Sequence, residues 1–299
     1  MAIHKPVLLK EVIELLEPKS GENFIDCNYG QGGHSKAILE KIKPGGGLLG
    51  IDADLDIKNI KDIKDIILIK DNFVNLKAIY EHNFPYPISG ILFDLGFSSD
   101  QLENSGRGFS FLTDEPLDMR YNPEGQRLTA KEILNKYGEK SLVRIFREFG
   151  EIGEKLARKM ARATVVRRGR RLFEMTSDLL EVIGAKAVRH KKRIHPATQF
   201  FQALRIEVNK ELDNLRQTLP QALEILKPGG RLAVISFHSL EDRIVKNYFR
   251  GWAREGRVEL LTKKPLTTGE EELKSNPRAR SAKLRAIKKI DSKECVKNF

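Results

Sequence analysis

Short apolar runs alternate with amphipathic helical patterns through the first hundred residues of the chain. Residues 7–17 place apolar side chains at helical spacing. The runs at 23–27, 47–52, 66–70 and 90–96 have the length and composition of buried strands. Strands separated by helices pair in parallel and are covered by those helices, so this pattern predicts an α/β fold.

The alternation stops between residues 106 and 197. This stretch opens with a loop rich in Gly, Ser, Phe and Asp, and continues with helical patterns near 129–136, 141–165 and 176–188. Helices without intervening strands do not extend a parallel sheet. The stretch is therefore predicted to be a helical insertion.

Strand patterns return towards the end of the chain. Residues 199–226 predict one long amphipathic helix that stops at Lys227-Pro228-Gly229-Gly230, and the next apolar run predicts a fifth strand. Two later runs, 258–261 and 283–290, predict a closing antiparallel pair. We therefore expect one discontinuous domain, residues 1–105 and 198–299, interrupted by the helical insertion at 106–197.

A glycine-rich loop follows the first predicted strand. Gly30, Gly32 and Gly33 lie between that strand and a stretch of helical spacing. Glycine lets the backbone approach a ligand closely, and a helix N-terminus presents unpaired N–H groups. Asp52 ends the second strand, 22 residues after Gly30, where a carboxylate accepts hydrogen bonds from both hydroxyl groups of a ribose. The loop and Asp52 favour an adenosyl ligand without deciding which one.

Two other interpretations of this loop stay open. A tight turn and a solvated Asp at a strand end would need no ligand. A nicotinamide coenzyme is a second alternative, but Ser35 stands where the dinucleotide pattern has its third glycine. This departure weakens the nicotinamide interpretation.

Polar and aromatic residues also follow the other predicted strands. Phe73, Asp94 and His238 lie at or shortly after the ends of three of them, and ligands in an open parallel sheet bind outside these strand ends. At Asp94, a carboxylate could orient an exocyclic amine for methyl transfer, with Phe97 stacking on the base. The alternatives are an Asp that caps a turn and a His that hydrogen-bonds within its turn.

Charge is unevenly distributed along the chain. The 299 residues carry a net charge of +12, with 15 acidic and 11 basic residues up to position 100 and 26 acidic and 42 basic residues after it. An Arg-rich part favours a nucleic acid partner, because Arg grips phosphate and stacks on bases. No stretch is apolar enough to span a membrane, and two cysteines form no disulfide framework, so a cytoplasmic protein is expected.

The densest basic stretch lies within the predicted insertion. Residues 151–200 hold 13 basic and 5 acidic residues. A charge run of this kind is often only a solvated face, but RNA contact is the favoured interpretation. The candidate RNA-binding residues are Arg158, Arg162, Arg167, Arg168 and Arg171, with Arg205 further along the chain. No CxxC pair suggests zinc, and neither His34 nor His238 has a partner at the spacing of metal ligands.

Seven segments resemble the bacterial small-subunit ribosomal RNA methyltransferase H family. The segments are 94–102, 107–111, 116–120, 195–198, 201–209, 229–243 and 276–281. The resemblance implies a class I S-adenosylmethionine-dependent methyltransferase, with a Rossmann-like α/β sheet and an inserted helical domain. It further implies methylation of the exocyclic N4 amine of a cytidine in the decoding region of 16S ribosomal RNA.

The resemblance also implies which residues bind S-adenosylmethionine. They are Gly32, Gly33, His34, Asp52, Phe73, Asp94 and Gln101. Asp94 then has two candidate roles, contact with adenine and orientation of the amine, and the catalytic candidates are Asp94, Phe97 and His238. The implied partner is 16S ribosomal RNA or the small ribosomal subunit, with no membrane partner; a homodimer is one alternative for the oligomeric state.

Three residues depart from the pattern of that family. Asn28 stands where it usually has Thr, Ile152 where it has Glu, and Gln199 where it has Arg. None of these changes removes an implied cofactor contact, but Gln199 puts one phosphate or substrate contact in doubt. An RNA-binding assembly factor that keeps the fold without catalysis is the alternative function.

Overall fold

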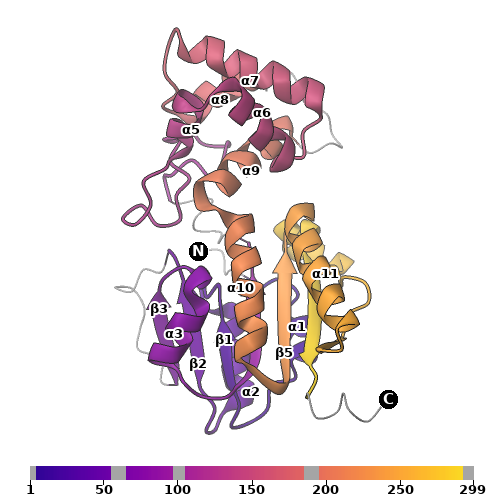
Figure 1. Cartoon of the computed structure of the whole chain (residues 1–299). Helices are drawn as coiled ribbons and strands as arrows, with labels where there is room; N and C mark the ends of the chain where they lie inside the picture. The colour runs from indigo at the N-terminus through magenta and orange to yellow at the C-terminus, as the bar shows by residue number, and fades with distance from the viewer. Residues whose placement is uncertain (1–4, 55–64, 97–104, 185–194, 292–299) are drawn as a thin grey trace. The chain divides into compact units, whose positions relative to one another are not determined.

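The computed structural model describes most of the chain. The described residues are 5–54, 65–96, 105–184 and 195–291. Phe97 and Gln101, two residues of the expected site, lie outside them. The chain divides into two compact units, a sheet-bearing unit of residues 1–96 and 212–299 and a helical unit of residues 97–211 (Figure 1).

The sheet-bearing unit is built on seven strands in the order β3-β2-β1-β4-β5-β7-β6. The first five strands run parallel, and β7 pairs antiparallel with both β5 and β6. The strands are β1 (Asn23–Asp26), β2 (Leu48–Asp52), β3 (Ile66–Lys70), β4 (Ile88–Asp94), β5 (Leu226–Ser236), β6 (Val258–Leu260) and β7 (Lys283–Lys289). All seven, including the antiparallel pair, were predicted from the apolar runs.

Helices cover both faces of this sheet. Figure 1 shows α3, α10 and α11 in front of the strands, while α1 and α2 lie behind them. The helices are α1 (Leu9–Leu16), α2 (Gly33–Ile42), α3 (Leu76–Asn83), α10 (Glu211–Ile225), α11 (Ser239–Arg254) and α12 (Glu270–Ser275), with short 3-10 turns η2 (Phe73–Asn75) and η4 (Pro277–Ser281). Apolar side chains of α1 and α2 pack on Phe24, Leu92 and Ile235 of the central strands, which fixes the sheet from behind.

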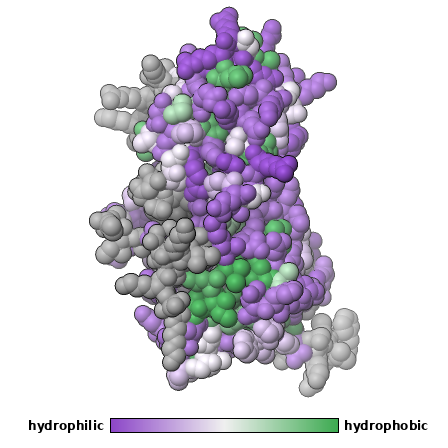
Figure 2. Space-filling model, turned by 90° about the vertical axis from the view of Figure 1, so that its left-hand side faces the viewer, coloured by the Kyte–Doolittle hydropathy of each residue, from purple (hydrophilic) through white to green (hydrophobic). Residues whose placement is uncertain are grey.

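The edge strand β3 is less covered than its neighbours. None of its five residues is fully buried, and Ile67 is 40% exposed. Figure 2 shows a broad apolar area on one side of the sheet-bearing unit. Among the described residues, no helix combines the length and apolar character that a membrane span requires.

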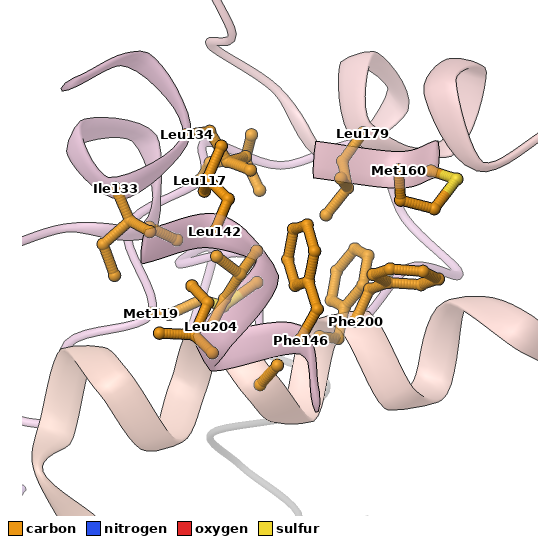
Figure 3. Packing of buried hydrophobic residues seen from close by; sticks show 14 of the residues in the cluster. Leu117, Met119, Ile133, Leu134, Leu142, Phe146, Met160, Leu179, Phe200 and Leu204 are labelled. Atoms are coloured by element: carbon orange, nitrogen blue, oxygen red, sulfur yellow. The ribbon is translucent and has the colours of Figure 1, made fainter. Parts of the chain in front are cut away.

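The helical unit has its own apolar core. Its helices are α5 (Ala130–Lys136), α6 (Glu139–Glu148), α7 (Glu154–Arg168), α8 (Thr176–Ile183) and α9 (Pro196–Asn209). Phe146 and Phe200 meet edge to face at 5.0 Å in the centre of the core, with Met160, Leu179 and Leu204 around them (Figure 3). This core is separate from that of the sheet, so the insertion is stabilised by its own packing.

Two helices expected from the sequence are each divided in the structure. The stretch 141–165 forms α6 and α7, because the chain turns between them with Glu151 at φ +50°. The stretch 199–226 forms α9 and α10, because Lys210 adopts the left-handed conformation at φ +54°. The apolar spacing continues across both breaks, which explains why the pattern alone predicted single helices.

The boundaries of the helical unit also differ from the expected 106–197. The unit extends from residue 97 to 211, so α9 belongs to it rather than to the sheet-bearing domain. The physical reason is that Phe200, Phe201 and Leu204 of α9 pack into the core of the helical unit.

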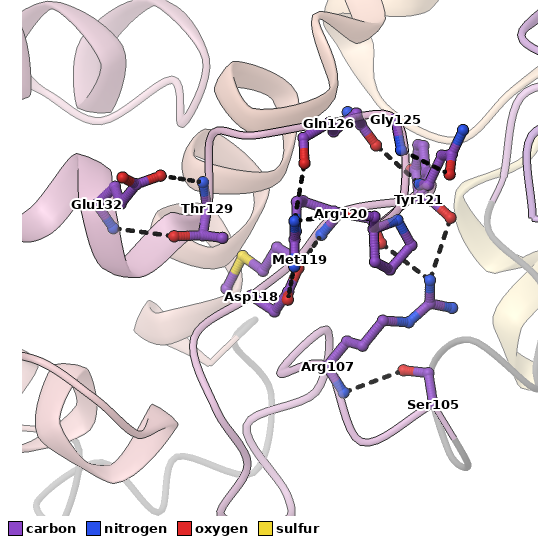
Figure 4. A network of polar contacts seen from close by, with 12 residues as sticks. Ser105, Arg107, Asp118, Met119, Arg120, Tyr121, Gly125, Gln126, Thr129 and Glu132 are labelled. Carbon is purple, nitrogen blue, oxygen red and sulfur yellow. Dashed lines mark hydrogen bonds and ion pairs between the residues drawn. The ribbon is translucent and has the colours of Figure 1, made fainter.

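The loop that opens the helical unit is held by polar contacts (Figure 4). The Arg107 guanidinium donates to the carbonyl groups of Arg120 and Tyr121, and Arg120 forms a two-pronged ion pair with Asp118. Asn209 of α9 donates to the Met119 carbonyl at 2.8 Å. These contacts hold Met119 in the left-handed region at φ +60°, although its side chain is fully buried.

Candidate functional site

The glycine-rich loop is tied to the sheet and to α2 through Asp26. This residue ends β1 and is almost fully buried. Its carboxylate accepts hydrogen bonds from the Ser35 hydroxyl at 2.7 Å and from the Asn28 N–H at 3.2 Å. Burial raises the pKa of Asp26, and these two hydrogen bonds partly oppose that rise. The buried Asp26 carboxylate thus holds the loop conformation through its contacts with Ser35 and Asn28.

Gly32 and Gly33 of the loop are required by close packing within the protein. Gly32 has φ +72°, and a Cβ there would lie 2.5 Å from the Tyr29 hydroxyl oxygen. A Cβ on Gly33 would lie 2.6 Å from Cγ of Pro6. Glycine was predicted here for close approach of a ligand, and the structure shows that internal neighbours alone already require it.

Asp52 is joined to the same loop. One carboxylate oxygen accepts the Gly30 N–H at 2.8 Å, and the other accepts the Asp54 N–H at 2.9 Å. Burial raises the pKa of Asp52, while the two backbone hydrogen bonds lower it. The second strand end therefore lies beside the glycine loop, which is the arrangement that the sequence predicted for ribose recognition.

Phe73 follows the third strand. It begins the turn η2, and its ring meets that of Phe93 edge to face at 5.7 Å. Phe93 is fully buried in β4, one residue before Asp94. The half-buried Phe73 is thus held against the strand that carries Asp94, where it can offer an apolar surface to a planar ring.

Asp94 is the most perturbed carboxyl group of the site. Burial raises its pKa to about 6; His34 opposes this rise, and the negative charges of Asp26 and Glu241 add to it. Its Oδ2 lies 3.5 Å from Nδ1 of His34. Its Oδ1 is buried and has no hydrogen-bond partner among the described residues. A buried unpaired oxygen is costly, which makes it a candidate ligand contact.

His238 caps a helix. It precedes α11, and its Nδ1 accepts the Glu241 N–H at 3.4 Å, while Glu241 accepts the N–H groups of Phe237 and His238. Its Nε2 lies 3.2 Å from a Glu241 carboxylate oxygen. The geometry thus shows His238 as a hydrogen-bonding cap of α11. Contact with a substrate base is a prediction that the structure leaves untested.

Two residues of this region were missed by sequence reasoning. Glu241 is buried, and its charge raises the pKa of Asp94; the capping pattern His238-x-x-Glu241 would have identified it. Asn28 has a buried side-chain oxygen with no hydrogen-bond partner among the described residues. No pattern in the sequence distinguishes this oxygen from that of any loop Asn.

The strand ends together carry a cluster of acidic and polar side chains. Asp26, Asp52, Asp94 and Glu241 are four buried or half-buried carboxyl groups near one glycine loop. Burial raises the pKa of the three Asp residues. Such a cluster favours a ligand that brings positive charge, and the unpaired oxygens of Asn28 and Asp94 offer it hydrogen-bond acceptors. The ammonium group of S-adenosylmethionine can donate to these oxygens, and its sulfonium group brings positive charge.

The expected RNA-binding arginines divide into two groups. Four of them serve the helical unit itself: Arg158 pairs with Glu154, Arg167 with Asp178, and Arg205 with Glu211, while Arg168 donates to the carbonyl groups of Leu134 and Tyr137. The exposed residues Arg162 and Arg171, together with Arg170, direct no guanidinium hydrogen bond or ion pair to another described residue. Only this second group is available to a partner without loss of internal contacts.

A hollow lies beside two of these exposed arginines. It has a volume of about 350 Å³ and is lined by Ala163, Val166, Arg167, Arg170, Arg171 and Glu181. Val166 and Leu172 expose more than half of their surface nearby in the chain. The α7–α8 face of the helical unit therefore combines cationic and apolar side chains, as surfaces that contact nucleotides do.

The sheet order, its antiparallel seventh strand and the glycine loop with Asp52 define a class I methyltransferase fold. Comparison with known proteins agrees. The model of the MraW methylase family matches residues 1–290. A Heliobacterium mobile protein named ribosomal RNA small subunit methyltransferase H is 45% identical over 311 residues, covering 96% of this chain and 99% of that protein.

Two further similarities were found. A Dehalococcoides mccartyi protein of the same name is 44% identical and covers 96% of this chain and 86% of that protein. The solved structure of an rRNA methylase from Streptococcus thermophilus is 12% identical with a TM-score of 0.43, covering 97% of this chain and 100% of that one. The chain belongs to the MraW methylase family, which confirms the resemblance found in the sequence. The protein is therefore an S-adenosylmethionine-dependent methyltransferase.

Proposed function

We propose that this protein transfers a methyl group from S-adenosylmethionine to the exocyclic N4 amine of a cytidine in the decoding region of 16S ribosomal RNA. The relatives named ribosomal RNA small subunit methyltransferase H support the substrate class. The observation that carries the choice of an amine is the buried, unpaired Oδ1 of Asp94 at the end of β4. An exocyclic amine has two hydrogens to donate, and a carboxylate oxygen only accepts.

Several residues of the sheet-bearing unit would hold the cofactor. Asp52 would accept from the ribose hydroxyl groups, Phe73 and Asp94 would lie on the side of the adenine ring, and the loop at Gly32 would lie on the side of the methionine part. When bound, the cofactor supplies a methyl group on a positively charged sulfur, which keeps the electron pair of the broken bond. The acidic side chains at the strand ends would stabilise that positive charge.

Asp94 would act on the amine rather than on the methyl group. The N4 lone pair is delocalised into the pyrimidine ring, so the amine is a weak nucleophile. An acceptor at Oδ1 fixes one amine hydrogen and thereby orients the nitrogen, which lowers the entropic part of the barrier. After the methyl group has moved, the same oxygen can receive the proton that the nitrogen must lose.

The helical unit would supply contacts to RNA. We assign these to Arg162, Arg170 and Arg171, since Arg158, Arg167, Arg168 and Arg205 already serve internal contacts. A substrate of this kind places the reaction in the cytoplasm, among ribosomal subunits.

The test is transfer of tritium from labelled cofactor to small ribosomal subunits from a strain that lacks this protein. The wild type is expected to label the RNA, with the label recovered as N4-methylcytidine after digestion. Asp94→Ala is expected to label it at least about 100-fold more slowly, the range of a positioned general base. Calorimetric titration of cofactor into both proteins separates a loss of binding from a loss of transfer.

The alternative function gives a different result. An RNA-binding assembly factor would bind the subunit but show neither cofactor affinity nor label in RNA. Absence of labelled N4-methylcytidine with the wild type would overturn the proposed function, and label in another nucleotide would overturn the choice of the cytidine amine.

A further inference from the structure

His34 connects the first helix of the chain to the candidate catalytic carboxyl group. It lies at the start of α2 and is 5% exposed. Its Nε2 is 2.9 Å from the carbonyl oxygen of Val7, and its Nδ1 is 3.5 Å from Oδ2 of Asp94. A carbonyl oxygen can only accept a hydrogen bond, so the contact with Val7 places a proton on Nε2.

This arrangement leaves the contact with Asp94 dependent on a second proton. When the ring is neutral with its hydrogen on Nε2, Nδ1 carries a lone pair that faces a carboxylate oxygen. Two such groups repel each other, whereas one proton between them makes the contact attractive. The two side chains therefore form a dyad, His34 and Asp94, whose geometry suits the uptake of one proton.

The surroundings of the dyad favour the same event. The negative charges of Asp26 in β1 and Glu241 in α11 both act on Asp94, and Asp26 also interacts electrostatically with His34. Both are buried acids, and their negative charge favours a bound proton. The second oxygen of Asp94, Oδ1, is buried and unpaired among the described residues, which leaves it available to a substrate hydrogen.

We propose, on the basis of the function proposed above, that His34 is a positioning residue for Asp94 and that the dyad accepts the proton released by the methylated amine. With one proton between Nδ1 and Oδ2, His34 fixes Oδ2, so that Oδ1 is the oxygen presented to the substrate. A histidine that only filled the core would instead direct its second nitrogen to a donor or to solvent.

The proton balance of the step is simple. The amine nitrogen that has gained a methyl group carries one hydrogen too many and a positive charge. Its N–H bond breaks, the electron pair stays on nitrogen, and the proton passes to Oδ1 of Asp94. The proton neutralises the carboxylate, so the charge of the dyad rises by one, and the dyad releases this proton to water when the product has left. No oxidant, reductant or metal ion enters this balance.

Two substitutions separate the two contacts of His34. His34→Gln places an amide nitrogen near the position of Nε2, so it keeps the hydrogen bond to Val7 and loses the contact with Asp94. His34→Asn places an amide nitrogen near the position of Nδ1, so it keeps a donor to Asp94 that does not titrate. His82→Gln is the control, because His82 is exposed on α3 and bonds only to the carbonyl of Ala78.

The first readout is the pH dependence of kcat at saturating cofactor and RNA. The carboxylate form of Asp94 is needed, so activity falls as pH drops through an apparent pKa near the value of about 6 that burial gives Asp94. His34 lowers that pKa, so His34→Gln is expected to move the acid limb to higher pH. It is also expected to reduce kcat about tenfold to a hundredfold at neutral pH. His34→Asn is expected to recover much of kcat.

The second readout does not depend on activity. Nitrogen NMR of histidine-labelled protein without cofactor is expected to show the hydrogen on Nε2 of His34 at alkaline pH, and an Nδ1 signal that Asp94→Asn changes. A hydrogen on Nδ1 in place of Nε2, or an Nδ1 signal unaffected by Asp94→Asn, would overturn the inference even if the protein methylates RNA. An unchanged acid limb in His34→Gln would do the same, whereas failure of the wild type to transfer label refutes only the function on which it rests.

Discussion

At the scale of single residues, the site is built from carboxyl groups whose burial reduces the stability of the folded state. Asp26, Asp52 and Asp94 are removed from water at adjacent strand ends, and burial raises the pKa of each. A raised pKa means that the folded state disfavours the carboxylate, which is the form present at neutral pH. Residues that carry function commonly reduce stability in this way.

Asp94→Asn is accordingly expected to stabilise the protein at neutral pH. The pKa of about 6 lies roughly two above the usual value of 3.8, and one pKa unit corresponds to about 1.4 kcal/mol, so the gain approaches about 3 kcal/mol at pH 7.5. Because the folded pKa is raised, wild-type stability is lost as pH rises from about 4 to about 6. The gain of the variant should therefore vanish near pH 4.

Urea unfolding at pH 4 and pH 7.5 measures this difference. Asp213→Asn is the control, since Asp213 lies on the surface of α10 with a side chain that is 61% exposed. A variant less stable than the wild type at both pH values would show that the Asp94 carboxylate is not a cost to the fold.

At the scale of elements, the helices end where the backbone turns rather than where the apolar pattern stops. Lys210 separates α9 from α10 at φ +54°, and its side chain forms an ion pair with Glu207 that is half exposed. A non-glycine residue in this conformation costs about 1 kcal/mol, and an exposed ion pair returns little of it.

Lys210→Gly is therefore expected to raise the free energy of unfolding by up to about 1 kcal/mol, because glycine adopts positive φ without a steric cost. Lys159→Gly is the matched control: Lys159 is exposed within α7, and glycine there should destabilise by about 1 kcal/mol. Thermal unfolding of both variants measures the two signs. Equal destabilisation would mean that residues 199–226 form one continuous helix, as the sequence pattern predicted.

At the scale of the whole molecule, charge is distributed over both units. Counted over residues 97–211, the helical unit has 23 Lys and Arg against 16 Asp and Glu, a net charge of +7; the remaining +5 of the total +12 lies in the sheet-bearing unit. The difference in net charge between the units is thus smaller than that between the two parts of the sequence. For RNA binding, we therefore expect the identity of the exposed arginines to matter more than the net charge of either unit.

We expect the triple variant Arg162→Gln, Arg170→Gln, Arg171→Gln to weaken RNA binding and to reduce its salt dependence. Loss of three phosphate contacts makes the slope of log K against log salt less negative by about 2. The matched control replaces three exposed lysines of the sheet-bearing unit, Lys10, Lys19 and Lys41, by Gln and should change the slope less.

Arg168→Gln should lower the melting temperature instead, because the Arg168 guanidinium holds the end of α5.

Filter binding over a series of salt concentrations measures these slopes. A triple variant with the wild-type slope would show that the α7–α8 face does not contact RNA. The hollow beside Arg170 and Arg171 would then be a feature of the helical unit alone.

Much of the fold followed from local patterns. Apolar runs gave all seven strands, because a buried strand needs a short continuous apolar segment wherever it lies. The glycine loop and Asp52 were also found from spacing, and the structure joins them through the Gly30 N–H. Seven segments of the sequence indicated the family, which the family match confirms. These features depend on residues near one another in the chain.

Only the tertiary structure decided which charges and which histidine nitrogens are engaged. His34 meets Val7 and Asp94, which are 27 and 60 positions away in the sequence, and the half-buried Arg167 pairs with Asp178 while Arg170 is exposed. The sequence determined the alternation of strands and helices and the kind of ligand loop, since apolar periodicity and glycine requirements act locally. Partners and protonation depend on burial and on distances between distant segments, and packing alone sets these.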